Sequence, residues 1–370
     1  MRVLVLNAGS SSLKVSLVGD DDHVLVDREF VATEGRLDEK QMAAAIREMD
    51  GIEAIGHRIV HGGPRYPASV RIDGDVIRYL VTITDLAPLH IPAALAAIAA
   101  AREVLPRVPA VACLDTAFHS RMPPQASTYA IPEEWRQRYG IKRYGFHGFS
   151  HAYASRKAAL MLGRSPHNLR VVTCHLGAGA SLAAVRGGRS MDTTMGFTPL
   201  EGLVMATRAG TIDPGALLYL ARHAHISELE MSDALDRASG LLALAGTPDM
   251  REVLRLIEEG DERAELAFDV YIHRLRSLIA AMAAAMNGLD VLVFTGGVGE
   301  NAAPVRAAAA SSLRFLGVEI DATRNSNAAP DSDISTAGAA VPTLVIKARE
   351  DIEVAREVRR VLTAVPTSVA

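Results

Sequence analysis

The chain has 370 residues, of which 49% are hydrophobic and 22% charged, and its 39 basic and 43 acidic side chains give a net charge of −4. A chain of this length is longer than a single hydrophobic core usually accommodates, so we expect two domains. The charges form no basic block or aromatic-interleaved stripe, which argues against nucleic acid as a partner. The longest small-apolar run, residues 93–101, is too short to cross a membrane, and the N-terminus lacks a signal-peptide pattern. Two cysteines without a CxxC partner are typical of a cytoplasmic protein.

Strand and helix patterns alternate along the chain, which indicates an α/β fold with a mostly buried sheet. The strands expected in the first half are residues 3–6, 13–18, 24–30, 54–60 and 110–114. Three helices are expected there. One begins after Leu37, and the other two cover residues 92–105 and 150–162. In the second half we expect strands at 170–175, 182–185, 291–295 and 343–346, and helices at 214–223, 262–286 and 351–362.

A turn rich in Gly and Ser joins the first two expected strands, in the sequence N-A-G-S-S-S-L-K of residues 7–14. Such residues are ordinary in turns, but the lysine and the density of donors favour a loop that binds an anion. The pattern returns in the second half as L-G-A-G-A-S-L, residues 176–182. Two hairpins can share small residues by coincidence. The alternative is a duplicated half-domain whose two loops hold a polyphosphate between them.

A third glycine-rich stretch, F-T-G-G-V-G-E-N at residues 294–301, follows an expected strand and suits close approach to a nucleotide. It is neither a dinucleotide fingerprint nor a Walker P-loop. Arg58 and Arg208 each lie among apolar or small residues, where a charge needs an ionic partner or an anionic ligand. Asp115 ends an expected buried strand, a common place for a functional carboxylate, although it could simply cap the turn. The acidic residues 20–22 are expected to form a solvated hairpin loop.

Two histidine pairs have a spacing of four residues, His57/His61 and His147/His151. Such a pair can hold zinc when it lies on a helix. The first pair lies in a strand-like run, and the second spans an expected helix start with Ser150 as the N-cap. No third ligand at a suitable spacing stands out, so hydrogen-bonded histidines are the favoured interpretation.

Eight blocks of the sequence resemble the acetate kinase family, in that family's order and over essentially the whole chain. They are N-A-G-S-S-S-L-K, G-H-R-I-V-H-G-G, A-P-L-H-I-P, L-D-T-A-F-H, R-Y-G-F-H-G-F-S-H, C-H-L-G-A-G-A-S, D-T-T-M-G-F-T-P-L-E-G-L and F-T-G-G-V-G-E-N. The resemblance implies the α/β fold of the actin, hexokinase and heat-shock-chaperone ATPase superfamily. That fold has two duplicated ribonuclease H-like domains with the active site in the interdomain cleft. The implied domains are residues 1–148 with 349–370, and residues 149–348.

The resemblance also implies an activity. A member of this family transfers the γ-phosphoryl group of ATP to acetate, reversibly and in line, and gives acetyl phosphate and ADP with Mg²⁺ or Mn²⁺. It implies a cytoplasmic homodimer without nucleic-acid or membrane partners. A propionate-preferring kinase of the same fold stays open, because one methylene in an apolar pocket is worth only ~1–3 kcal/mol, as does a pyrophosphate-using enzyme. A different class is a nucleotide-gated, non-catalytic actin-like protein, which has no reason to keep arginines and histidines around a small carboxylate pocket.

The resemblance assigns roles to individual residues. The implied catalytic residues are Arg58, His90, Asp115, His147 and Arg208. The implied nucleotide contacts are Ser10, Ser12, Lys14, His175, Leu176, Gly177, Gly179, Gly297, Gly299 and Asn301. The implied acetate pocket comprises Arg58, Val60, Leu89, Phe146 and Pro199, and the implied metal residues are Asn7 and Glu350. The chain departs from the family pattern at Ala178, Lys347 and Arg349, which bears on nucleotide binding and on the register of Glu350.

The implied residues suit the chemistry. A carboxylate with a pKa of roughly 4 is already ionised at neutral pH, so the reaction needs no strong general base. The obstacle is the approach of one anion to another. Arginines, a divalent cation and imidazole donors can neutralise charge on the oxygens of the transferring group.

Overall fold

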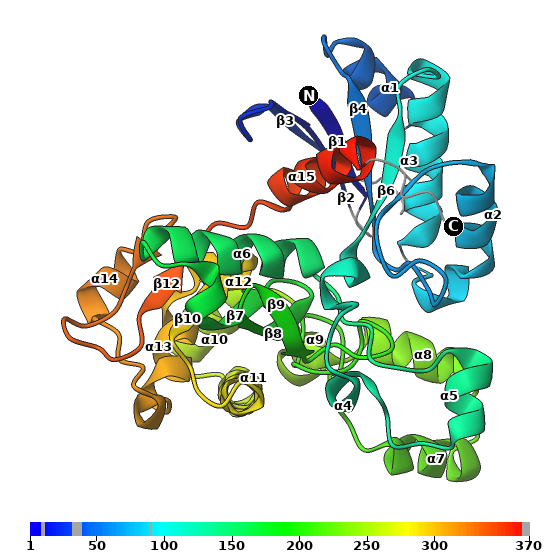
Figure 1. The fold of residues 1–370 in the computed structure, drawn as a ribbon. Coiled ribbons are helices and arrows are strands. Elements are labelled where there is room, and N and C mark those ends of the chain that lie inside the picture. Colours follow the sequence, from blue (N-terminus) through cyan, green and yellow to red (C-terminus); the bar gives the residue numbers. More distant parts are fainter. Residues whose placement is uncertain (9–11, 32–38, 89, 365–370) are drawn as a thin grey trace. The chain divides into compact units, whose positions relative to one another are not determined.

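The computed structural model describes residues 1–8, 12–31, 39–88 and 90–364 (Figure 1). The chain divides into two compact units. The first comprises Met1–Ser120, Phe146–Phe149 and Arg349–Ala370, and the second comprises Arg121–Gly145 and Ser150–Ala348. Residues 121–145 thus group with the second unit, whereas the sequence expectation placed them in the first. The expected domain limits at residues 148 and 349 stay a prediction.

The first unit is built on a six-stranded sheet in the order β3-β2-β1-β4-β6-β5. Its strands are β1 (Val3–Ala8), β2 (Ser12–Val18), β3 (Val24–Val31), β4 (Ala54–Ile59), β5 (Val70–Arg71) and β6 (Ala110–Leu114). Strand β2 runs antiparallel to both β1 and β3, whereas β4 and β6 run parallel to β1. The short β5 is antiparallel to β6.

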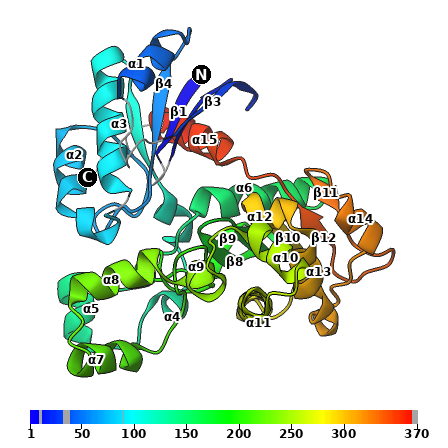
Figure 2. The ribbon, with the colours of Figure 1, turned by 180° about the vertical axis from the view of Figure 1, so that it is seen from behind.

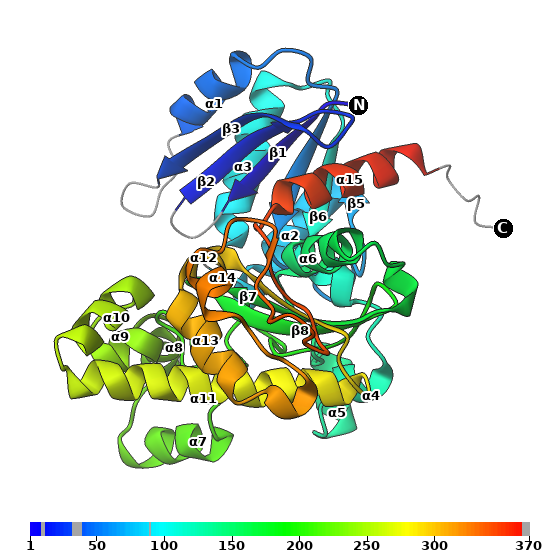
Figure 3. The same ribbon diagram turned by 90° about the vertical axis from the view of Figure 1, so that its left-hand side faces the viewer.

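Both faces of this sheet are covered by helices (Figure 3). Leu4 and Leu6 of β1 belong to one apolar cluster with residues of α1 (Glu39–Arg47) and α3 (Ile91–Val104). Val3 and Val5 belong to another cluster with residues of α15 (Glu350–Thr363). Because successive side chains of a strand point to opposite faces, β1 is apolar on both sides and lies in the middle of the unit. The other helices of this unit are α2 (Gly74–Thr82), η1 (Thr84–Leu86) and η2 (Asp115–His119).

The second unit repeats this topology. Its sheet has the order β11-β12-β10-β7-β8-β9. The strands are β7 (Arg170–Leu176), β8 (Ala180–Arg186), β9 (Arg189–Thr193), β10 (Val291–Thr295), β11 (Ser332–Asp333) and β12 (Thr343–Val345). As in the first sheet, the first three strands are antiparallel neighbours, the next two continue parallel, and a short antiparallel strand closes the edge. This repetition confirms the expected fold class of two duplicated α/β domains.

Among the described residues, the second unit contains more helices than the first. Its helices are α4 (Pro124–Ser127), α5 (Glu133–Tyr139), α6 (Gly148–Met161), η3 (Pro166–Asn168), α7 (Pro214–His223), α8 (Glu228–Arg237), α9 (Gly240–Ala245), α10 (Met250–Glu258), α11 (Glu262–Ala285), α12 (Gly296–Asn301), α13 (Ala303–Ser311), η4 (Arg314–Leu316) and α14 (Ala322–Ser326). The long helix α11 packs on β7 and β8. It begins where expected because Asp261 caps it, accepting hydrogen bonds from the Arg263 and Ala264 amides. No helix in the described ranges is both long enough and apolar enough to span a bilayer.

Two local expectations are wrong. Ser150 does not cap α6, which already begins at Gly148, and its hydroxyl instead pairs with His175 Nδ1 at 2.7 Å. Asp22 is not simply solvated, because it forms ion pairs with Arg356 and Arg359 of α15. The sequence could not indicate this pairing, since the partners lie at opposite ends of the chain.

Candidate active site

Arg58 on β4 is the centre of a charged cluster in the first unit. The strand register places Asn7 beside Lys14 on β2 and beside Arg58 on β4, so the three side chains share one face of the sheet. The Arg58 guanidinium donates to Asn7 Oδ1 at 3.0 Å and to Asp115 Oδ2 at 2.5 Å. Glu350 accepts from Asn7 Nδ2 at 3.2 Å, and its Oε2 lies 3.7 Å from Arg58 Nε.

Two carboxylates share this one guanidinium. Burial alone would lower the pKa of Arg58, but the charges of Asp115 and Glu350 raise it above the ordinary value. Burial raises the pKa of Asp115; the charge of Arg58 opposes that rise, and the charge of Glu350 adds to it. Two carboxylates thus face one guanidinium, and a cation beside them would favour their ionised forms.

The oxygens of Asn7, Asp115 and Glu350 fit a hard divalent cation such as Mg²⁺ or Mn²⁺. Asp115 Oδ1 is buried and has no hydrogen-bond partner among the residues that the structure describes, which a nearby cation would satisfy. Within those same residues no group of three or more His, Cys, Asp or Glu side chains could hold a metal. Mg²⁺ commonly takes one or two protein carboxylates and completes its shell with phosphate oxygens and water, so this donor set suffices for it.

The backbone around His147 packs directly on Asp115. The His147 amide donates to Asp115 Oδ2 at 3.2 Å, and His147 has a φ of 54°, which is uncommon outside glycine. A Cβ atom at Gly148 would lie 2.0 Å from the Asp115 carbonyl oxygen. Only glycine therefore allows this close approach. The fold thus brings the backbone of His147 against the side chain of Asp115.

The expected acetate-pocket residues are divided between the two units. Val60 and Phe146 are buried in the first unit, where Phe146 also accepts a hydrogen bond from His119 Nε2 at 3.0 Å if that nitrogen carries the proton. His90 precedes α3 and is half-buried. Pro199 belongs to the second unit. Leu89 and Ser10 lie outside the described residues, and for Ser12 only its place in β2 is described.

Arg208 in the second unit bonds to a carbonyl group rather than to an acid. Its NH1 donates to Pro199 O at 3.0 Å and lies 3.7 Å from Met205 Sδ. Burial lowers the pKa of Arg208, and the charge of Asp236 opposes this only in part. A buried guanidinium of this kind is suited to receive an anionic ligand.

The two glycine-rich turns of the second unit pack on each other. The β7–β8 turn closes with a hydrogen bond from the Gly177 amide to Gly179 O at 3.0 Å. Gly296, which opens α12, has a φ of +80°, and a Cβ atom there would lie 2.7 Å from Leu176 O. A Cβ atom at Gly297 would meet no described atom within 4 Å. The two turns are thus in close contact, and the Gly297 backbone faces open space.

A cavity of about 580 Å³ lies beside these turns, within the second unit. Glycine and alanine positions form part of its lining. Apolar side chains from α9, α10 and α11 form another part, and Asp249, Arg251 and Asn301 add polar groups. The lining residues are Gly177, Ala178, Ala206, Leu241, Pro248, Asp249, Met250, Arg251, Leu254, Tyr271, Gly297, Val298, Asn301, Ala302 and Pro304. Backbone amides beside an apolar cavity suit a nucleotide, with its phosphates at the turns and its base against the apolar wall.

The sequence did not single out the apolar wall of this cavity. Leu241, Met250 and Leu254 lie on helices, where apolar residues usually belong to the core. Tyr271 is also buried, and its hydroxyl has no hydrogen-bond partner in the described part of the chain. An unsatisfied hydroxyl in a cavity wall is available to a bound ligand. No local motif distinguishes these residues from ordinary core positions.

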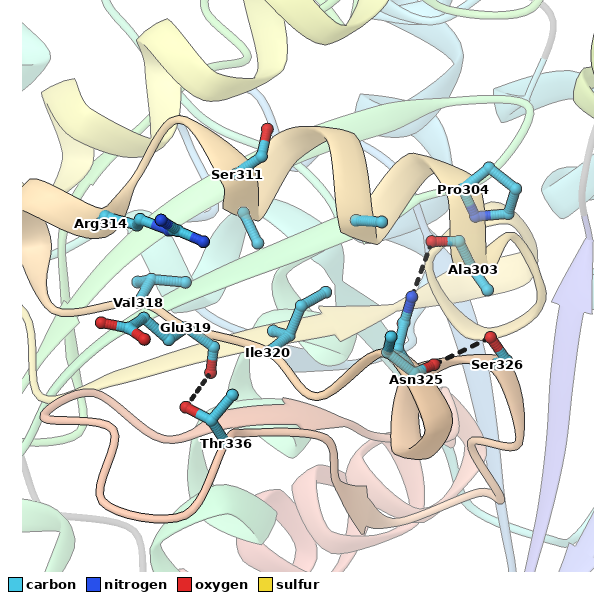
Figure 4. Close-up of a pocket in the computed structure, with 13 residues that line it drawn as sticks. Ala303, Pro304, Ser311, Arg314, Val318, Glu319, Ile320, Asn325, Ser326 and Thr336 are labelled. Atoms are coloured by element: carbon cyan, nitrogen blue, oxygen red, sulfur yellow. Dashed lines mark hydrogen bonds between the residues drawn. The ribbon is translucent and has the colours of Figure 1, made fainter.

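A second cavity, of about 410 Å³, lies between α13 and α14 (Figure 4). Its polar residues are largely engaged with neighbouring backbone: Asn325 Nδ2 donates to Ala303 O at 2.9 Å, and Ser326 donates to the Ala322 carbonyl at 2.9 Å. None of the expected site residues lines it. We therefore take the Arg58 cluster of the first unit and the nucleotide-sized cavity of the second unit as two candidate sites, each within its own unit.

The buried histidines have different environments. His151 bonds to Thr173 Oγ1 at 2.7 Å and Ser181 Oγ at 2.8 Å, and His61 Nδ1 accepts from a backbone amide at 2.8 Å. These two agree with the expectation of hydrogen-bonded histidines. For His57 the expectation is wrong, because both ring nitrogens are buried without a hydrogen-bond partner among the described residues. Burial lowers the pKa of His57 to about 3.

Comparison with known proteins gives one consistent family. The Acetokinase family model matches residues 27–356. The acetate kinase of Gloeobacter violaceus is 45% identical over 96% of this chain and 98% of its own, and that of Thermotoga maritima is 42% identical over 98% and 99%. Among solved structures, a Francisella tularensis propionate kinase has a TM-score of 0.88 and 38% identity, covering 97% of this chain and 99% of its own. The acetate kinase of Porphyromonas gingivalis has a TM-score of 0.87 and 34% identity, covering 98% and 100%.

Proposed function

Because this chain belongs to the acetokinase family, we propose that it is an acetate kinase, which transfers the γ-phosphoryl group of ATP to acetate and forms acetyl phosphate and ADP. The main structural support is the Arg58 cluster, in which Asp115 and Glu350 share one guanidinium. A salt bridge with a purely structural role would not need a second carboxylate and a buried, unsatisfied Asp115 Oδ1. The cluster therefore suits a site that handles additional charge.

In the proposed reaction, one oxygen of acetate attacks the γ-phosphorus in line with the leaving oxygen of ADP. One P–O bond forms and one breaks, and no proton moves because acetate is already ionised. The protein must reduce the repulsion between two anions. We assign this role to Arg58 and Arg208, with imidazole donors from His90 and His147, because preorganised cations and donors stabilise charge as it develops on phosphoryl oxygens.

We assign the substrates to separate sets of residues. ATP and ADP are proposed to bind in the cavity of the second unit. The proposed contacts are Ser10, Ser12, Lys14, His175, Leu176, Gly177, Gly179, Gly297, Gly299 and Asn301. The methyl group of acetate is assigned to Val60, Leu89, Phe146 and Pro199. Asn7 and Glu350 would hold Mg²⁺ with Asp115 beside them, and the ion would neutralise phosphate charge.

We further propose that the enzyme is a cytoplasmic homodimer, and the exposed apolar helix α7 supports the dimer. No residue of α7 is buried against the described chain, and its large apolar side chains Leu218 and Tyr219 are 57% and 63% exposed. A helix of ten residues is marginal in water without packing. A second copy of the chain would cover this apolar helix in a self-complementary contact.

A direct assay tests the proposed activity. Purified protein is incubated with ATP, MgCl₂ and acetate, and hydroxylamine traps any acyl phosphate as a hydroxamate. We expect a hydroxamate that depends on both ATP and acetate. The proposal is wrong if the folded, metal-supplied protein yields none. Replacing ATP by pyrophosphate in the same assay tests the alternative phosphoryl donor.

A propionate-preferring kinase is the second candidate, because a propionate kinase is among the similar solved structures. The two substrates differ by one methylene, worth only ~1–3 kcal/mol in an apolar pocket. Values of kcat/KM for acetate and propionate, measured on one preparation, decide between them. We expect the larger value for acetate.

A further inference from the structure

Glu300 connects two segments that the proposed mechanism treats separately. Its Oε1 accepts a hydrogen bond from the Gly296 amide at 2.9 Å and a second one from the Ala348 amide, also at 2.9 Å. Gly296 opens the turn at the start of α12, and Gly297 of this turn lines the proposed nucleotide cavity. We refer to it as the nucleotide turn. Ala348 is the last residue of the second unit, two positions before Glu350. One carboxylate oxygen thus holds both the nucleotide turn and the segment that leads to Glu350.

The backbone that carries Glu300 is itself fixed. Arg306 on α13 is 2% exposed, and its NH1 donates to Gly299 O at 2.9 Å and to Glu300 O at 2.8 Å. Its other nitrogens bond to Asn325 at 2.8 Å. A buried guanidinium nitrogen that donates to two carbonyl groups of the turn, while the other nitrogens anchor the guanidinium to Asn325, restrains this backbone. The position of the Glu300 side chain is therefore determined by the same turn that would contact the nucleotide.

The segment before Glu350 is held at three successive residues although it has no regular structure. The Ile346 amide donates to Phe294 O at 2.9 Å, and the Lys347 amide to Asp331 Oδ1 at 3.1 Å. The Ala348 amide, bound by Glu300, is the last of the three. Beyond it, Glu350 reaches Asn7 and Arg58 in spite of the unusual residues at positions 347 and 349. Of these three amide contacts, only the one at Ala348 comes from the nucleotide turn itself.

We propose that Glu300 is a positioning residue that couples occupancy of the nucleotide turn to the placement of Glu350. A nucleotide that orders the Gly296 turn also orders Glu300, which in turn holds the Ala348 amide and fixes where α15 begins. This inference rests on the proposed nucleotide site. It adds a link between that site and Glu350 through the Ala348 amide.

Amide hydrogen exchange on the metal-free full-length protein tests the link without measuring activity. In the wild type, ADP should slow exchange at Gly296 and also at Ala348. In Glu300→Ala, both amides lose their acceptor and should exchange roughly five- to tenfold faster without ligand. ADP should still protect the Gly296 turn of this variant, with weaker affinity, but should no longer protect Ala348. Glu300→Gln keeps an acceptor oxygen and should retain protection of both amides.

Glu319→Ala is the matched control, because Glu319 is an exposed acidic residue at the second cavity (Figure 4). It should leave exchange at Gly296 and Ala348 unchanged. If Glu300→Ala does not fold, Glu300→Asp replaces it, because the shorter side chain cannot reach both amides. Full ADP-dependent protection of Ala348 in the folded Ala or Asp variant would overturn the inference. The inference is equally overturned if ADP protects Gly296 but not Ala348 in the wild type.

A kinetic measurement separates this role from general stabilisation. Loss of active protein would lower kcat and leave every KM unchanged. Loss of the link should instead raise the KM for ATP and the half-saturating Mg²⁺ concentration together, about fivefold or more, with little change in the KM for acetate. If the wild type forms no acetyl phosphate, the proposed function fails, yet the exchange experiment still reports on the link.

Discussion

The charge of Arg58 and the shape of its guanidinium contribute separately to the proposed catalysis, and one substitution can distinguish the two contributions. Arg58→Lys keeps the positive charge beside Asp115 and Glu350, but a single ammonium cannot reproduce the fork that reaches Asn7 and Asp115. We expect the fold to persist and kcat to fall by about 10²-fold, as for loss of other electrostatic stabilisers. Steady-state kinetics and thermal unfolding of the same preparation measure both effects.

Arg78→Lys is the control for this experiment. Arg78 forms an ion pair with Asp75 on the exposed surface of α2, so the same chemical change there should alter neither kcat nor stability. Wild-type turnover in Arg58→Lys would mean that Arg58 serves the fold alone. Arg58→Ala is less informative, because it leaves two carboxylates without their guanidinium and costs about 3–5 kcal/mol of stability.

The burial of His57 predicts how the free energy of unfolding changes with pH. Its pKa is lowered to about 3 in the folded protein because the ring is buried, whereas the unfolded chain binds a proton near pH 6.5. Between these values the unfolded state holds more protons, so the free energy of unfolding falls as the pH falls. His119, whose pKa burial lowers to about 4, acts in the same direction.

The measurement is urea unfolding at several pH values between 7 and 4. Replacing His57 by Met, which is apolar and adaptable, should reduce the decline by up to about 1.4 kcal/mol per pH unit. His167→Met, at an exposed position, is the matched control. An unchanged slope in His57→Met would show that His57 does not stay neutral in the fold.

The contact between the two glycine-rich turns of the second unit can be tested at Gly296. An alanine there would place its Cβ 2.7 Å from Leu176 O and would also need a φ of +80°. The α12 turn must then move away from the β7–β8 turn. We expect the KM for ATP to rise about tenfold or more while the KM for acetate changes little, because the cavity beside the turns is assigned to the nucleotide.

Gly338→Ala isolates the backbone strain from the collision. Gly338 has a similar φ of +86°, but no described atom lies within 4 Å of its Cβ position. This variant should lose about 1 kcal/mol of stability, typical of such strain, and keep wild-type kinetics. Equal effects of the two alanines on the KM for ATP would contradict the proposed packing of the turns.

The elements that sequence patterns predict well are those with a strong local signal. The strands 54–60 and 110–114 and the helix 262–286 carry continuous apolar runs or clear caps, and the structure confirms them. Arg58 and Asp115 stand out because charged residues are unexpected beside buried strands. Glycine-rich turns are visible for the same reason, since few other residues tolerate their backbone conformation.

Residues whose role depends on distant partners could not be predicted in this way. Arg306 looks like an ordinary helix-surface arginine, yet it is buried against the carbonyl groups of a neighbouring turn. Tyr271 and Met250 resemble core residues, and only their tertiary positions show that they line a cavity. Asp22 precedes its partner Arg359 by most of the chain. Local periodicity contains no information about such contacts.

The two sheets share one topology but not one set of accessory helices. In the second unit, the segment between β9 and β10 contains α7 to α11. Helices α9, α10 and α11 contribute to the nucleotide-sized cavity, whereas no residue of α7 or α8 is buried. This long segment therefore has two parts with different environments. One part lines a cavity, and the other lies at the periphery of the second unit (Figure 2).

The peripheral part yields a prediction about assembly. Ile212, Leu218 and Tyr219 are 39%, 57% and 63% exposed on and before α7, an arrangement that water does not favour for a short helix. If a second copy covers α7, Leu218→Glu places a charge in the buried contact and should convert the dimer to a monomer, as measured by light scattering after size-exclusion chromatography. Phe315→Glu is the control, because Phe315 is 74% exposed on η4, a different element. A wild-type monomer, or a Leu218→Glu variant with the wild-type mass, would place the dimer contact elsewhere or remove it, and α7 would then need another partner.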